Sequence, residues 1–210
     1  GMLVRFPQAL EIAEYFNYDR YGEIVLGLPF EGQSRLYTPT AVVEPGAPAI
    51  DLAYQNSLRR ITLDDVNSAQ NPTVLRHPNG LPFSLDNMFR GGDLVQNAIG
   101  ILGYDFNLYR IMPTGPADYT AVNPRPVEPE EVGGRLQVAA MNTLNYFLTI
   151  DTGIYICGPN LDMECRGADT AEELARQRAK LLQALYSLDA AVIGLNELEN
   201  TTGVEPLADI

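Results

Sequence analysis

Two polar side chains stand just after predicted strands, where they could share one site. Asn142 follows the predicted strand 135–141, and Glu197 follows the apolar run 190–195. If the strands are parallel neighbours, their carboxyl ends meet at the edge where such sheets usually bind ligands. A carboxylate there would hold Mg²⁺ against a phosphate, and an amide would donate to a phosphate oxygen. Glu199 is equally polar, and a solvated strand end is the alternative interpretation for all three.

The residues between these strands predict a β-α-β unit. Thr170 and Glu173 fit a capping box, in which each side chain satisfies a free backbone donor at the start of a helix. The helix is predicted to run to about residue 188. Its apolar face consists of Leu174, Leu181, Leu182, Leu185 and Leu188. The run 190–195 has the length and apolarity of a strand buried on both faces, and a right-handed crossover is expected.

Residues 145–168 form a predicted loop-rich segment that contains Cys157 and Cys165, the two cysteines of the chain. A disulfide between them is favoured and would fit an oxidising compartment. Two free thiols, or half of a metal site, are the alternatives. The single histidine, His77, lies far away in a Pro/Asn-rich stretch and is predicted to be a surface residue.

The first part of the chain, residues 2–122, is predicted to be rich in β-structure. Strands are predicted at 10–15, 23–26, 35–37, 61–63, 93–102 and 104–112. A helix is predicted over 48–58 and an irregular stretch over 64–90. The last two strands should form a hairpin that turns near Gly103. About five strands and one helix favour an OB-like β-barrel, with a small β-sandwich as the alternative.

Residues 123–134 divide the chain. They carry three prolines and two glycines. Because proline lacks a backbone donor and restricts the residue before it, this segment is predicted to be an extended linker. The predicted organisation is therefore an OB-like domain over 2–122, a linker, and a second domain over 135–210 that mixes α and β structure.

The composition limits the classes of function. The chain has 210 residues and a formal net charge of −13, which argues against a broad basic surface for nucleic acid. Any such site would be a local basic pocket or one assisted by a metal. No apolar run approaches the ~18 residues of a membrane span, so no membrane partner is expected.

Several separated motifs of the second part resemble one known family. Residues 136–147 (LQVAAMNTLNYF) resemble the opening strand of the endonuclease/exonuclease/phosphatase superfamily, an α/β sandwich. Further segments that fit this family in the right order are 157–159, 165–169, Glu173, 176–180 and 193–200. The likeness is to its large secreted bacterial nucleases of the ExeM/NucH type. Residues 92–95, 100–106 and 109–114 also resemble the OB-like region that precedes the nuclease domain there.

This resemblance implies roles for the two strand-end residues. Glu197 matches the acidic residue that binds the catalytic divalent metal, and Asn142 matches the asparagine of the metal and phosphate site. The implied activity is hydrolysis of phosphodiesters in nucleic acid with Mg²⁺ or Mn²⁺. The implied location is extracellular or periplasmic, with the export signal upstream. Met141 departs from the family, which usually has phenylalanine there.

The later catalytic motifs of the family have no counterpart in this sequence. Its Gly-Asp-x-Asn segment, its catalytic Asp and His, and its final Ser-Asp-His segment have no match. The chain is therefore expected to be a nuclease fragment with an incomplete α/β sandwich, inactive or nearly so by itself. Exposed sheet edges would then favour a homo-oligomer.

A non-catalytic binding or spacer module is the alternative function. An OB-like barrel would grip single-stranded nucleic acid through aromatic stacking and a basic groove. The candidate contacts are Tyr104, Phe106, Tyr109 and Arg110. Aromatic residues in this alternation are also typical of core positions, and Arg110 would also suit a charge at the barrel rim.

Overall fold

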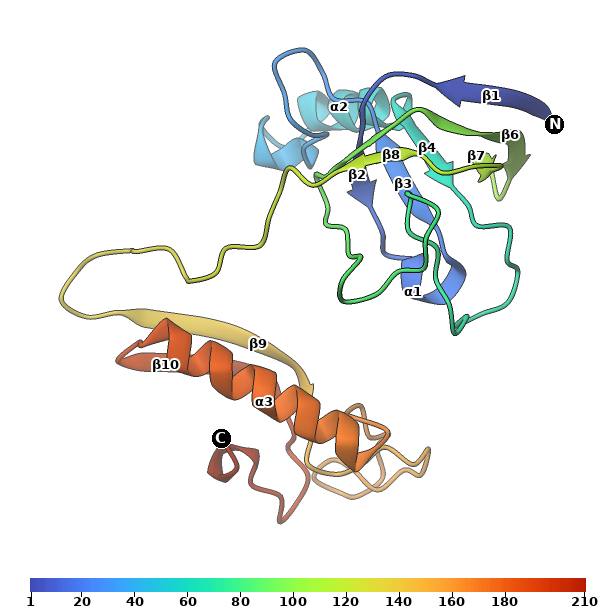
Figure 1. Cartoon of the computed structure of the whole chain (residues 1–210). Helices are drawn as coiled ribbons and strands as arrows, with labels where there is room; N and C mark the ends of the chain where they lie inside the picture. Colours follow the sequence, from blue (N-terminus) through green and yellow to red (C-terminus); the bar gives the residue numbers. More distant parts are fainter. The chain divides into compact units, whose positions relative to one another are not determined.

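The structure is a computed structural model that describes residues 1–210 and divides into two compact units, Gly1–Arg125 and Pro126–Ile210. The protein is mixed α and β, with one large, mostly antiparallel sheet, one small parallel sheet and three α-helices (Figure 1). The Pro-rich segment 123–134 contains no helix or strand. None of the helices combines the length and apolarity needed to cross a membrane.

Unit 1 is built on an eight-stranded sheet with the order β1-β6-β7-β4-β3-β2-β5-β8. Its strands are β1 (Met2–Phe6), β2 (Leu10–Glu14), β3 (Ile24–Gly27), β4 (Arg60–Leu63), β5 (Leu94–Gln96), β6 (Ala98–Asp105), β7 (Leu108–Pro113) and β8 (Asp118–Thr120). Neighbours are antiparallel except β4 and β7, which are parallel. The helices are α1 (Tyr18–Tyr21) and α2 (Ala47–Ser57), with a 3₁₀ turn at Pro39–Ala41.

The core of unit 1 follows from the alternation of apolar side chains along its strands. Leu10 and Ile12 of β2 and Ile24 and Leu26 of β3 point into the core and are at most 3% exposed. The rest of the core cluster is Tyr18, Leu63, Phe89, Val95, Ala98, Ile111 and Ala117. The predicted helix over 48–58 is confirmed by α2.

Two local predictions for unit 1 are wrong. Residues 35–37 do not form a strand; the Leu36 N–H donates to the side chain of Glu11 instead of to a neighbouring strand. The β6–β7 hairpin turns at Phe106 and Asn107, not near Gly103. Both turn residues have positive φ, 49° and 60°, as a two-residue type I′ turn requires.

Unit 2 is the predicted β-α-β unit. β9 (Val138–Tyr146) and β10 (Val192–Leu198) pair in parallel, and α3 (Ala171–Leu188) lies between them in sequence and runs along the pair (Figure 1). The predicted capping residues both satisfy backbone donors: Thr170 Oγ1 accepts the Glu173 N–H at 3.2 Å, and Glu173 Oε2 accepts the N–H of Asp169, one residue before the N-cap, at 3.1 Å. A 3₁₀ turn at Pro206–Ala208 follows β10.

Two features of β9 and β10 differ from the sequence prediction. Both strands run past their predicted ends, so Asn142 and Glu197 lie inside them. β10 is not buried on both faces: its residues alternate between exposed and half-buried, and Val192 is 54% exposed. The reason is that, within unit 2, α3 covers one face of the two-stranded sheet and no second layer of helices or strands covers the other.

The predicted disulfide between Cys157 and Cys165 is confirmed. Both cysteines are buried, and it closes the irregular segment between β9 and α3. Cys157 also pairs with Met163 through two backbone hydrogen bonds of 3.0 and 2.9 Å. The predicted loop therefore has a fixed conformation without a helix or strand of its own.

Candidate functional site

The structure brings Asn142 and Glu197 together. Asn142 is in register with Asn196 of the parallel neighbour, and Asn142 Nδ2 donates to Glu197 Oε1 at 2.7 Å. Glu197 Oε2 accepts the Asn145 N–H at 3.2 Å, and Asn142 Oδ1 accepts the Leu144 N–H at 2.8 Å. Both side chains are exposed, so a ligand can reach the amide and the carboxylate from solvent.

The backbone around this pair departs from regular strand geometry. The register shifts after Asn196, so Glu197 alone lies opposite the three residues 143–145 of β9. Leu144, Asn145 and Glu197 have φ values of 56°, 56° and 60°. Such left-handed conformations cost non-glycine residues on the order of 1 kcal/mol each and concentrate at functional sites. The bulge redirects the Glu197 side chain toward Asn142.

Side chains from two elements hold this bulge in place. The Thr143 hydroxyl donates to the Asn196 carbonyl at 2.9 Å, which ties β9 to β10 across the irregularity. Gln177 of α3 donates through Nε2 to the carbonyls of Thr143 at 3.2 Å and Leu144 at 2.9 Å. These contacts satisfy carbonyls that a regular ladder would have paired, so the helix supports the strained segment.

Glu199, a candidate for a solvated strand end, is instead buried and organises the base of the site. Its Oε2 accepts the N–H groups of Leu148 at 2.7 Å and Thr149 at 3.0 Å, and its Oε1 accepts the Thr149 hydroxyl at 2.6 Å. Burial alone would raise the pKa of Glu199, but these hydrogen bonds hold it below its ordinary value. Cys157 Sγ lies 3.7 Å from Glu199 Oε1. The disulfide therefore packs against Glu199, which is two residues after Glu197 in the sequence.

The Asn142–Glu197 pair suits a divalent cation that keeps most of its water ligands better than one that is enclosed by protein ligands. No group of three or more His, Cys, Asp or Glu side chains that could hold a metal occurs in the structure. Mg²⁺ commonly keeps several waters and takes one or two carboxylates together with substrate phosphate. The Glu197 carboxylate and the Asn142 amide oxygen are hard ligands of this kind and are open to solvent.

The aromatic candidates of unit 1 are surface residues, not core residues. Tyr104 and Tyr109 are 62% and 61% exposed, and their rings meet edge to face with centroids 5.0 Å apart. Together with Arg60 they line an open cavity of about 410 Å³. Phe106, at the hairpin turn, is also exposed.

Arg110, the fourth candidate of this group, is not on the surface. It is 6% exposed, and its Nη1 donates to Glu23 and to Asp64, the latter at 2.6 Å. Burial would lower the pKa of Arg110, but the two carboxylates raise it above its ordinary value. The guanidinium is therefore the centre of an ion-pair network that links β7 to Glu23, just before β3, and to Asp64, just after β4, and it is not free to contact a ligand.

The prediction of His77 as a surface residue is wrong. The side chain is fully buried, with its ring edge-on to Tyr119 at 4.5 Å and near Phe89 at 5.7 Å. Nδ1 accepts the Asn79 N–H at 3.1 Å, and burial lowers the pKa of the imidazole, which favours the neutral form. The irregular stretch 64–90 folds over aromatic core residues, and this carries His77 inside.

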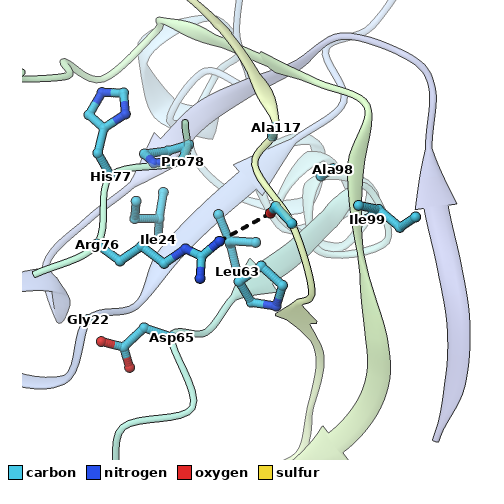
Figure 2. Close-up of a pocket in the computed structure, with 12 residues that line it drawn as sticks. Gly22, Ile24, Leu63, Asp65, Arg76, His77, Pro78, Ala98, Ile99 and Ala117 are labelled. Carbon is cyan, nitrogen blue, oxygen red and sulfur yellow. Dashed lines mark hydrogen bonds between the residues drawn. The ribbon is translucent and has the colours of Figure 1, made fainter. Parts of the chain in front are cut away.

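A small cavity next to His77 is not a substrate site. Its volume is about 10 Å³, which is room for roughly one water molecule. Figure 2 shows the Arg76 guanidinium in this cavity, bonded to the Gly115 carbonyl at 3.2 Å. The His77 ring points away from Asp65, so the two do not form an acid–base pair (Figure 2).

Comparison with known protein families, curated proteins and solved structures finds no match for this chain. Its chemistry is therefore inferred from its own residues. Among them, Asn142 and Glu197 combine convergence from two strands, exposure, and a strained backbone held by a neighbouring helix. That combination makes them the candidate active-site pair.

Proposed function

We propose that unit 2 carries the first part of the catalytic centre of a secreted, divalent-metal-dependent nuclease of the endonuclease/exonuclease/phosphatase superfamily. The observation that carries this proposal is the 2.7 Å hydrogen bond between Asn142 Nδ2 and Glu197 Oε1 at the shared end of two parallel strands. The motif resemblance of residues 136–200 supports it. The disulfide of Cys157 and Cys165 supports an extracellular or periplasmic location.

In this proposal Glu197 holds Mg²⁺ or Mn²⁺ through its carboxylate, and water fills most of the coordination sphere. The metal, when bound, polarises the phosphoryl group of a phosphodiester. Asn142 keeps Glu197 oriented, and its amide donates to a non-bridging phosphate oxygen of the substrate. Exposure of both groups allows a nucleic-acid backbone to approach.

Proton transfer is the step for which unit 2 offers no histidine. The single histidine, His77, belongs to unit 1 and is buried among aromatic rings. General acid–base catalysis typically contributes 10²–10⁴-fold to the rate, roughly, and most often uses histidine. We therefore expect residues 1–210 to bind the metal and phosphate weakly and to turn over phosphodiesters very slowly.

Metal binding tests the proposal most directly. Paramagnetic Mn²⁺ should broaden the NMR signals of β9 and β10 around residues 142–145 and 197, and the Glu197→Gln variant should weaken binding at least about tenfold. Glu205→Gln, a change at an exposed carboxylate outside the pair, is the matched control. Equal Mn²⁺ affinity in wild type and Glu197→Gln would contradict the proposal.

An OB-like barrel in unit 1 belongs to the same proposal. β1 and β2 occupy positions one and six of the sheet order, although only residues 7–9 connect them. This connection spans at most about 14 Å, so the sheet must curl until β1 and β2 approach each other. A barrel with one parallel pair, β4 and β7, satisfies this constraint.

Single-stranded nucleic-acid binding by unit 1 is the second candidate function. The exposed Tyr104–Tyr109 pair beside Arg60 favours it, because stacking on an aromatic ring contributes about 1–3 kcal/mol per base. Tyr104→Ala combined with Tyr109→Ala should abolish oligonucleotide binding at this surface. Tyr54→Ala, an exposed tyrosine on α2, provides the control.

Self-association of unit 2 is a further part of the proposal. β9 and β10 have no other strand beside them, and the exposed Val138 and Val192 lie on the uncovered face. Unpaired edges of this kind are templates for pairing with another chain. A clean monomer at high concentration in size-exclusion chromatography with light scattering would contradict this part.

A further inference from the structure

A groove on unit 1, outside both sites described above, gathers arginine and aromatic side chains. We call it the Arg35 groove. It consists of two adjoining hollows of about 620 and 420 Å³ that share Arg35, Tyr37, Gly92 and Asn123. One wall is the irregular segment 29–41, and the other is formed by residues 90–92 and 122–123. Each hollow has the volume of a typical small-ligand site.

Both arginines of this groove are available to an anion. Arg35 is exposed, and its guanidinium lies over the Tyr37 ring, 4.9 Å from the centroid. Arg90 Nη1 donates to the Asn123 carbonyl at 3.1 Å, which leaves its other N–H groups free. Neither guanidinium takes part in a salt bridge. In a chain with a net charge of −13, this is a local basic pocket.

The wall that carries Arg90 is fixed before any ligand arrives. Asp93, which is 2% exposed, accepts the N–H groups of Arg90 at 2.7 Å, Val122 at 2.9 Å and Asn123 at 2.9 Å. It also accepts the Tyr119 hydroxyl at 2.7 Å. These donors compensate its charge, so Asp93 opposes an anion in the groove less than a free carboxylate would.

The segment 29–41, which forms the opposite wall, is attached to β2 by a hydrogen bond to a buried carboxylate at the floor of the groove. Glu11 is 1% exposed and accepts the Leu36 N–H, which anchors the segment between Arg35 and Tyr37. Burial raises the pKa of Glu11, although the Leu36 N–H and the positive charges of Arg35 and Arg60 act in the opposite direction. The floor of this hollow thus holds one buried carboxylate, against the two guanidinium groups of Arg35 and Arg90.

Aromatic rings complete the lining. Tyr37 stacks under Arg35, and Tyr15 is 51% exposed with its ring held edge-on against Phe89 at 5.7 Å. Phe30 lies under the Arg59 guanidinium, 4.1 Å from the ring centroid. Flat rings beside guanidinium groups match a ligand that joins a planar base to a phosphate.

From this arrangement we infer that the Arg35 groove binds a nucleotide. The phosphate pairs with Arg35 and Arg90, and the base stacks against Tyr37 or Tyr15. The ligand is a free nucleotide or one unit of a single strand, since both present the same chemistry. This site is separate from Glu197 and from the Tyr104–Tyr109 surface, so it goes beyond the proposed function.

The test measures binding to the whole chain at about 50 mM salt, where phosphate contacts are strong. The probes are adenosine monophosphate, inorganic phosphate and a labelled single-stranded oligonucleotide. Arg35→Ala combined with Arg90→Ala should weaken nucleotide binding at least about tenfold. Arg5→Ala combined with Arg20→Ala removes the same charge from β1 and α1 and should change affinity by less than about twofold.

Further measurements distinguish a free nucleotide from a single strand, and the Arg35 groove from the other two proposed sites. In the Tyr104→Ala with Tyr109→Ala variant, where the other proposed strand-binding surface is absent, tighter binding of the strand than of the mononucleotide identifies single-stranded nucleic acid, and equal binding identifies the free nucleotide. Tyr104→Ala with Tyr109→Ala, and Glu197→Gln, should leave the binding of adenosine monophosphate intact, because none of these residues lines the Arg35 groove. Arg35→Lys with Arg90→Lys keeps the charge and should still weaken binding, because the planar guanidinium is lost. The inference would be overturned if neither Arg35→Ala with Arg90→Ala nor Arg35→Lys with Arg90→Lys changed the affinity for the nucleotide. It would also be overturned if inorganic phosphate bound as tightly as the mononucleotide.

Discussion

The two units of this chain are held together by different means. All eleven residues of the apolar core cluster belong to unit 1, where strands bury alternating side chains. In unit 2 the most buried residues are Tyr146 and the disulfide pair Cys157 and Cys165, with the polar Glu199 and Thr201 beside them. Non-directional apolar burial therefore stabilises unit 1, whereas unit 2 depends on a covalent link and on directed hydrogen bonds.

The units also differ in charge. Unit 1 has 9 basic and 13 acidic residues, whereas unit 2 has 5 basic and 14 acidic residues. A phosphate that approaches unit 2 meets a strongly negative surface, so binding there needs a cation to compensate the charge. In unit 1 the guanidinium groups of the Arg35 groove offer direct contacts. The comparison predicts metal-dependent phosphate binding in unit 2 and metal-independent binding in unit 1.

The largest expected effect is the loss of a core side chain from unit 1. Ile12→Ala should lower the free energy of unfolding of unit 1 by about 2–5 kcal/mol, because Ile12 is fully buried and its loss leaves a cavity. Hydrogen exchange of β2 and β3 measures the change. Ile50→Ala, at a 72% exposed position, is the control. Equal acceleration of exchange in unit 2 would contradict the separation of the two cores.

Removal of the disulfide should act on unit 2 alone. Cys157→Ser with Cys165→Ser, or reduction, should destabilise unit 2 by about 2–3 kcal/mol, because the loop regains freedom in the unfolded chain. Hydrogen exchange of β9 and β10 with and without reductant tests this. Unit 1 contains no cysteine and should serve as the internal control. Unchanged exchange in β9 would show that the disulfide is dispensable.

Acid should weaken unit 2 through Glu199. Because hydrogen bonds lower its folded-state pKa below 4.5, Glu199 contributes stability above about pH 4.5 that is lost as the pH falls through the folded pKa. Glu199→Gln should remove this acid sensitivity and cost about 1–3 kcal/mol at neutral pH. Glu205→Gln is the matched control. If the stability of the Glu199→Gln variant fell with pH as that of the wild type does, Glu199 would not be the source of the acid sensitivity.

The stability of unit 1 should also depend on pH, through His77. The effect should be smaller than that of Glu199 on unit 2 and should occur at a higher pH. Burial lowers the folded-state pKa of His77 below 6.5, so its contribution to stability falls as the pH drops from 6.5 toward the folded pKa. The slope is at most about 1.4 kcal/mol per pH unit. His77→Asn keeps an acceptor near Nδ1 and should remove the slope. Denaturant unfolding of both proteins from pH 7 to pH 5 measures the difference.

The sequence alone determined the features that depend on short-range pattern. Alternation identified β2, and the Thr170–Glu173 spacing identified the start of α3. The spacing of the two cysteines favoured a disulfide, and the β-α-β order predicted the parallel pair that brings Asn142 to Glu197. Each of these signals lies within a few residues or follows from a connection rule that admits one arrangement.

Only the tertiary structure decided which polar and aromatic side chains are buried. His77 and Arg110 looked like surface residues but lie inside, whereas Tyr104 and Tyr109 are exposed. β1 was not predicted, because its role comes from pairing with β6, far along the chain. Burial and pairing depend on which distant segments pack together, and local pattern carries no information about that choice. The Arg35 groove has the same origin, since its walls, residues 29–41 on one side and 90–92 with 122–123 on the other, are far apart in the sequence.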